Sequence, residues 1–113
     1  MRRAAIYLHS TRVGTLIEDA DGYAFIYDEG YVDNPDATAV SLTLPLTKKP
    51  YRSNAMIPFF DGLIPEGWLL DIVEKNWKID GRDRMALLLA CCKDCIGAVS
   101  VLDISRKEAN DEE

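Results

Sequence analysis

The sequence predicts an α+β domain, a small antiparallel β-meander or sheet with two main helices, on the strength of three observations. Short β-rich runs separated by turns fill the first half of the chain, helical spacing of apolar residues follows residue 65, and one more β-rich run closes it. The 113 residues, 48% of them hydrophobic, suit a single domain with its own core. We therefore expect one domain over residues 1–104 and a charged, disordered tail over 105–113.

The first three strands are predicted from apolar runs and the turns between them. Residues 4–8 (AAIYL) and 13–18 (VGTLIE) are joined by the short connection HSTR. Asp21-Gly22 is a turn signal, and the β-rich run YAFIY at 23–27 follows it. Together they predict an antiparallel meander.

A fourth strand is predicted over residues 38–46 (TAVSLTLPL), after a loop containing NPDA. Apolar residues alternate there with Ser41 and Thr43, which is typical of a half-buried strand. The expected inward-facing residues are Val40, Leu42 and Leu44. A polar connection, KKPYRSN, follows.

The first main helix is predicted to begin at Pro65, because the first turn of a helix does not need the missing proline N–H. In PEGWLLDIVEKNW the apolar residues that share one face are Leu69, Ile72, Val73 and Trp77. Trp68 falls at the margin of this face. A second helix, RDRMALLLACCK, is expected to be capped by Asp80, with Asp83 in its first turn, and residues 96–104 to form the last strand.

Net charge and the length of the apolar runs argue against several functional classes. The net charge of −6 and the pI of about 4.7 argue against direct binding to nucleic acid, which requires clustered Lys and Arg. No apolar run approaches the roughly 20 residues of a membrane span, and no hydrophobic signal-peptide core follows Arg2-Arg3. We expect a soluble, cytoplasmic protein.

Cys91, Cys92 and Cys95 form the sequence CCKDC, which contains one C-x-x-C pair. One interpretation is a metal or redox site; the other is buried thiols that act as small hydrophobic residues. Zinc usually takes four ligands, and the single histidine, His9, is distant in sequence. We expect no metal and no cofactor.

Signals for catalysis are weak. A Ser-His-Asp or Cys-His site would have to use His9, which lies at a predicted strand end and is expected to be a surface residue. No dinucleotide or phosphate-binding glycine motif is present. Asp61 and Glu66 could form the carboxylate pair of a small hydrolase, but acidic residues near a helix start also complement the helix dipole. We expect a protein that is not an enzyme.

Five blocks in order, VGTL, FIYDEGYV, SLTLPL, FFDGLIPEG and DCIGAVSV, carry a family resemblance. Over about residues 4–103 the chain resembles the N-terminal subdomain of HipA-like serine/threonine kinases. Residues 59–67 match the FF-x-x-L-x-P-E-G block of that family, and residues 94–99 match its D-C-x-G-A block, which accounts for Cys95 without a metal. The kinase core that follows in the family has no counterpart in these residues, so no catalytic residue carries over.

A free-standing version of this subdomain resembles HipS, the antitoxin of HipB–HipS–HipT modules. The resemblance implies an antitoxin that binds and inhibits a HipT-type kinase, with a HipB-like helix-turn-helix DNA-binding protein as a further partner in a larger complex. The alternative is a non-inhibitory structural subdomain, or a fragment of a longer HipA-like kinase.

The candidate partner-binding residues lie in the stretch FFDGLIPEGWLL at 59–70 and just after it. Trp68 is the first candidate, because an exposed Trp on a rigid helix is a typical interface anchor; the alternative is that it folds over Phe59 or Phe60 into the core. Gly67 is expected to clear space beside it and Gly62 to permit the turn before it. The full candidate set is Phe60, Asp61, Glu66, Gly67, Trp68 and Asp71.

Overall fold

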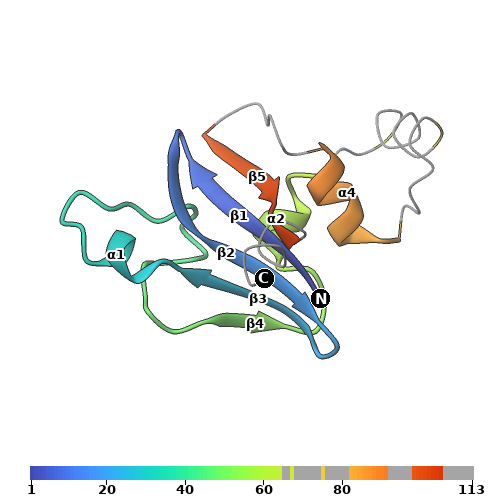
Figure 1. Ribbon diagram of the computed structural model, residues 1–113, viewed down its shortest axis with the longest axis horizontal. Helices are drawn as coiled ribbons and strands as arrows, with labels where there is room; N and C mark the ends of the chain where they lie inside the picture. The colour runs from blue at the N-terminus through green and yellow to red at the C-terminus, as the bar shows by residue number, and fades with distance from the viewer. Residues whose placement is uncertain (65–66, 68–74, 76–81, 92–97, 106–113) are drawn as a thin grey trace, which may run out of the picture.

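The computed structural model describes residues 1–64, 67, 75, 82–91 and 98–105, and its centre is a five-stranded antiparallel sheet in the order β4-β3-β2-β1-β5 (Figure 1). The predicted α+β class is confirmed. The strands are β1 (Arg2–Leu8), β2 (Thr11–Asp19), β3 (Gly22–Tyr27), β4 (Tyr51–Ser53) and β5 (Val99–Asp103). The described helices are α1 (Glu29–Val32), α2 (Pro58–Asp61) and α4 (Arg84–Cys91).

The meander β1-β2-β3 forms as the sequence predicts. A tight turn at His9, which has a positive φ of 58°, joins β1 to β2. Gly14 of β2 faces Ile6 on one side and Tyr27 on the other. A Cβ at Gly14 would lie 2.5 Å from the carbonyl oxygen of Ile26, so only glycine fits between the strands at this point.

The last strand returns to the first. β5 pairs antiparallel with β1, so that Ala4 lies opposite Asp103 and Leu8 opposite Val99. Beyond β5, the Ser105 hydroxyl accepts a hydrogen bond from the Arg3 N–H at 2.6 Å and donates one to the Arg3 carbonyl at 3.1 Å. Ser105, which the sequence assigned to the tail, is therefore bonded to the sheet, while residues 106–113 lie outside the described residues.

The predicted strand over residues 38–46 is wrong. These residues form a loop that contains only an isolated bridge between Ser41 and Leu44, and Leu42 is 99% exposed instead of facing the core. The strand beside β3 is β4, which lies within the stretch taken as a polar connection. Pro45 is one reason, because proline cannot donate a hydrogen bond to a neighbouring strand.

The helix predicted over 65–77 lies outside the described residues except for Gly67 and Lys75, and so does Asp80. The next helix, α4, begins at Arg84. Its N-terminal cap is Asp83 and not Asp80, the cap that the sequence predicted. The Asp83 carboxylate accepts a hydrogen bond from the Ala86 N–H at 3.1 Å, and the Asp83 carbonyl accepts one from Leu87, also at 3.1 Å. This is the geometry of an N-cap residue.

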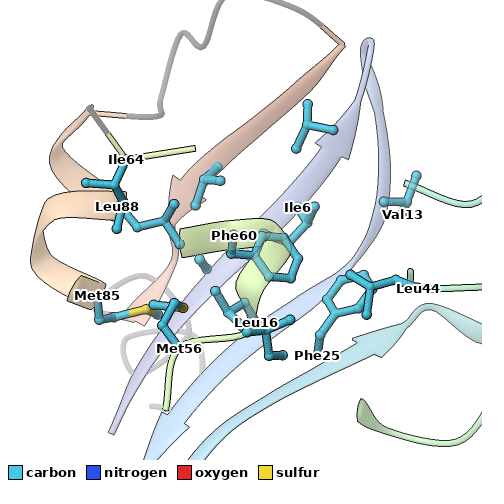
Figure 2. Close-up of a cluster of buried hydrophobic side chains, with 14 of the residues drawn as sticks. Ile6, Val13, Leu16, Phe25, Leu44, Met56, Phe60, Ile64, Met85 and Leu88 are labelled. Carbon is cyan, nitrogen blue, oxygen red and sulfur yellow. The ribbon is translucent and has the colours of Figure 1, made fainter. Parts of the chain in front are cut away.

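The core lies between the sheet and the two helices α2 and α4 (Figure 2). Phe60 from α2 packs against sheet residues such as Ile6, Leu16 and Phe25 (Figure 2). Met85 and Leu88 from α4 lie on the other side of Phe60 (Figure 2). These side chains are fully buried. Each such side chain contributes about 1.5–3 kcal/mol when it leaves water, so this core is the main source of stability.

Candidate partner-binding surface

The first part of the predicted partner segment is built into the core. α2 begins with Pro58 at its first position and ends at Gly62, whose N–H donates to the Pro58 carbonyl at 3.0 Å. Phe60 is 0% exposed, and its ring centroid lies 5.1 Å from that of Phe25 and 5.2 Å from that of Phe59. The Phe60 side chain packs inside the domain, so it supports the segment and does not itself offer a contact surface.

Asp61 is fixed by an ion pair. Its Oδ1 accepts a hydrogen bond from the Arg84 Nε at 2.6 Å, and this bond joins α2 to the first turn of α4. The Asp61 side chain remains 43% exposed, so it lies at the surface beside the predicted contact. Because both side chains are partly exposed, solvent screens this ion pair, and it contributes little to the stability of the fold. Its main effect is to fix the position of Asp61 relative to α4.

The two glycines of the segment differ in what they need. Gly67 has a φ of 63°, a left-handed conformation that glycine adopts without strain. A Cβ at Gly67 would meet no atom of the described residues within 4 Å, so the space expected beside Trp68 stays a prediction. Gly62 has an ordinary helical φ of −68°, so the turn after α2 does not depend on glycine there.

Three predicted contact residues, Glu66, Trp68 and Asp71, lie outside the described residues. Their roles stay predictions, as does the choice between an exposed and a core Trp68. Lys75, in the same predicted helix, is described and exposed.

A surface feature that the sequence did not predict is the loop of residues 37–47. Three tyrosine hydroxyls bind its backbone. The Tyr31 hydroxyl donates to the Thr38 carbonyl at 2.7 Å and accepts from the Thr38 N–H at 3.0 Å. The Tyr51 hydroxyl donates to the Pro45 carbonyl at 2.6 Å. We call this segment the tyrosine-held loop.

Tyr27 supplies the third hydroxyl, from inside the core. It accepts a hydrogen bond from the Val40 N–H at 3.0 Å and donates one to the Leu44 carbonyl. Burial raises the pKa of the Tyr27 phenol, so the hydroxyl keeps its proton and remains a donor. Pro45, which interrupts the run, is a sequence signal against a strand here, but no local signal indicates that these tyrosines hold the loop.

The residues considered for catalysis do not come together in the described part of the chain. His9 is an exposed turn residue, as expected, and its N–H donates to the Ala98 carbonyl at 2.6 Å. Cys91 ends α4, whereas Cys92 and Cys95 lie outside the described residues. Among the described residues, no group of three His, Cys, Asp or Glu side chains could hold a metal ion.

A shallow hollow lies at the turn between β2 and β3, away from α2. Its lining includes Asp19, Asp21, Tyr23 and Asn54. It is acidic, and no described side chain points into it as an unpaired buried group. It therefore offers no chemistry beyond that of a solvated turn.

The HipA N-terminal domain family model matches residues 4–102. This chain belongs to the HipA N-terminal domain family. The N-terminal domain of HipA toxin has the same fold, with a TM-score of 0.67, 28% identity, and coverage of 91% of this chain and 92% of that one.

Two relatives show the lengths in which this HipA-type domain occurs. An uncharacterized protein of Haemophilus influenzae is 32% identical over 101 residues, which cover 89% of this chain and 92% of that protein. A Sinorhizobium fredii protein named as a proposed kinase, Y4mE, is 29% identical over 91 residues, which cover 80% of this chain but only 22% of that protein. The domain therefore occurs both as almost a whole chain and as a part of a longer one.

Within the described residues, no helix has the length and apolar character to cross a membrane.

Proposed function

We propose that this chain is a non-catalytic antitoxin subunit that binds a HipT-type, HipA-like serine/threonine kinase and holds it inactive. The observation that carries the proposal is the family match over residues 4–102. In Y4mE the matching residues make up 22% of a protein named as a proposed kinase, so such a domain occurs within a kinase-named chain. The Haemophilus influenzae relative supports the idea that the domain also acts as a separate chain.

The proposed contact is the segment from Asp61 to Asp71, with Trp68 as its apolar anchor and Asp61, Glu66 and Asp71 at its polar rim. Its start has a rigid base, because Phe60 is buried and Asp61 is bound to Arg84. A segment whose base is fixed loses less conformational entropy on binding than a free loop does. Any contact with DNA would then be made by a HipB-like partner of the kinase.

A kinase titration tests the proposal. The purified chain is added to a HipT-type kinase, and autophosphorylation is followed with increasing ATP. We expect inhibition that is complete near one chain per kinase. Relief by excess ATP indicates that the chain fills the nucleotide cleft, and inhibition that is independent of ATP indicates that it holds a mobile loop. Full kinase activity in the presence of excess bound chain would refute the antitoxin function.

A second function, a structural subdomain that only stabilises a kinase, is favoured by the partial coverage of Y4mE. It predicts a different result in the same experiment. The chain would bind the kinase and raise its solubility and melting temperature, while phosphorylation stayed unchanged or increased.

A further inference from the structure

The tyrosine-held loop has no charged residue. Its eleven positions, from 37 to 47, read ATAVSLTLPLT in a chain of which 28% is charged. Asp36 and Lys48 mark its two ends. Exposed loops are normally polar, whereas the centre of a protein–protein interface is depleted of charge. The composition of this loop is that of an interface.

The tip of the loop presents an apolar side chain to solvent. Leu42 is 99% exposed, and its exposed neighbours Thr43 and Pro45 are uncharged. A single exposed leucine is common on protein surfaces. Leu42 differs because the structure around it fixes its position: Ser41 Oγ lies 2.9 Å from Thr43 Oγ1, and the Leu44 N–H donates to the Ser41 carbonyl at 3.1 Å.

The base of the loop is also fixed. Leu44, two residues from the tip, is only 4% exposed in the core, and three tyrosine hydroxyls bind the backbone on both sides of it. These tyrosines come from three separate elements, β3, α1 and β4. Such support reduces the entropy that a loop loses when it docks, which is how a rigid loop gains affinity.

The tyrosine-held loop lies apart from α4, to which Asp61, the described start of the proposed contact, is bound (Figure 1). In Figure 1 the chain after α1 runs at the opposite side of the sheet from α4. A partner that contacts both the tyrosine-held loop and the region of α4 would be bound at two separated points. Once one contact has formed, the other forms within the same complex.

We propose that Leu42 is the anchor of a second contact, in which it enters an uncharged apolar pocket of the HipT-type kinase. The proposal rests on the proposed function for the identity of the partner. The pocket is apolar because no charge of the tyrosine-held loop could complement a charged one. Ser41 and Thr43 supply hydroxyls for its rim.

Calorimetry with a purified HipT-type kinase tests this contact. Leu42→Ser should weaken the complex by about 10- to 100-fold, since it removes the burial of one leucine. The melting temperature of the free chain should not change, because Leu42 has almost no contact to lose. The matched control is Leu102→Ser on β5, where the leucine is 37% exposed, and its affinity should equal that of the wild type.

A third variant separates the stiffness of the loop from the leucine itself. Tyr31→Phe removes both hydrogen bonds to Thr38 and leaves Leu42 in place. We expect a weaker effect, about 2- to 10-fold, because only the ordering of the loop is lost.

The outcomes are distinguishable. If the wild-type chain does not bind the kinase, both the proposed function and this contact are overturned. If it binds and Leu42→Ser binds equally well, the second contact is overturned and the proposed function stands. If Leu42→Ser instead abolishes a self-association seen by light scattering, the pocket belongs to a second copy of the chain, and the kinase contact at this loop is overturned.

Discussion

Arg2 and Asp83 are 81 positions apart in the chain, yet they form a two-point ion pair. Arg2 Nη2 lies 2.9 Å from Asp83 Oδ1, and Arg2 Nη1 lies 3.1 Å from Asp83 Oδ2. The same guanidinium binds Glu18 on β2, with Nη2 2.8 Å from Oε2. Hydrogen bonds to Glu18 and Asp83 raise the pKa of Arg2 above its usual value. Because Asp83 also caps α4, one carboxylate joins the start of the sheet to the start of that helix.

Replacing Asp83 should show which of its two roles matters more. Asp83→Ala removes both the cap and the ion pair, and we expect the free energy of unfolding to fall by about 1–2 kcal/mol. Asp83→Asn keeps a cap acceptor and loses the charge, so its loss should be smaller. Urea unfolding of both variants measures the difference. Equal losses would show that the ion pair, and not the cap, carries the effect.

The buried Tyr27 predicts a loss of stability in alkaline solution. Burial raises its pKa in the folded state, so the unfolded chain releases the phenolic proton first. Each rise in pH above about 10, the ordinary tyrosine value, then favours the unfolded state. Unfolding free energies measured from about pH 8 to about pH 11 should therefore decrease over the upper part of that range.

Two variants assign this pH dependence. Tyr27→Phe should flatten the decrease, although it should also lower stability at neutral pH by about 1–3 kcal/mol because the Val40 N–H and the Leu44 carbonyl lose their partner. Tyr23→Phe is the comparison: burial and Glu18 raise the pKa of Tyr23 as well, so this variant should also flatten part of the decrease, but without the loss at neutral pH that follows from releasing the Val40 N–H and the Leu44 carbonyl. An unchanged alkaline slope in Tyr27→Phe would contradict this assignment.

The meander was predictable from sequence, because its signals are local. Apolar runs and the Asp21-Gly22 turn specify β1, β2 and β3 without reference to distant residues. The last strand was predictable for the same reason. The cap of α4 was misplaced by three residues, because both Asp80 and Asp83 satisfy the local preference and only the tertiary contact with Arg2 favours Asp83.

The loop at 37–47 was not predictable from local signals. Its residues alternate as a strand does, but hydroxyls from Tyr27, Tyr31 and Tyr51 bind its carbonyl and N–H groups in place of a neighbouring strand. The candidate site was predictable only in part. The sequence does not distinguish which of the adjacent residues Phe59 and Phe60 faces the core. The structure shows that Phe60 is fully buried against Phe25.

The Phe60 side chain should act on stability and not directly on binding. Phe60→Ala leaves a cavity between the sheet and α4, and such changes typically cost about 3–5 kcal/mol. Phe60→Leu is the control, since it keeps most of the volume and should cost much less. Guanidinium unfolding measures both. If Phe60→Ala weakened kinase binding with no loss of stability, the ring would belong to the contact surface after all.

Trp68 is predicted to anchor the kinase contact, and its replacement tests the central part of the proposed function. Trp68→Ala should leave the fold nearly intact and weaken the complex. Truncation of an interface anchor typically costs about 2–4 kcal/mol, which is roughly 30- to 1000-fold in dissociation constant. Cells that express the kinase should lose protection to a matching extent. Calorimetry and a growth assay measure the two effects.

Trp77 is the internal control, because helical spacing places it nearer the apolar face shared with Leu69 and Ile72. Trp77→Ala should therefore lower the melting temperature first and weaken binding only as a consequence. The two variants are compared by thermal unfolding and by kinase affinity under the same conditions. If Trp68→Ala lowers the melting temperature as far as Trp77→Ala does, while the folded fraction still binds the kinase, then Trp68 is a core residue. The contact surface must in that case be sought elsewhere, with Leu42 as the first residue to replace.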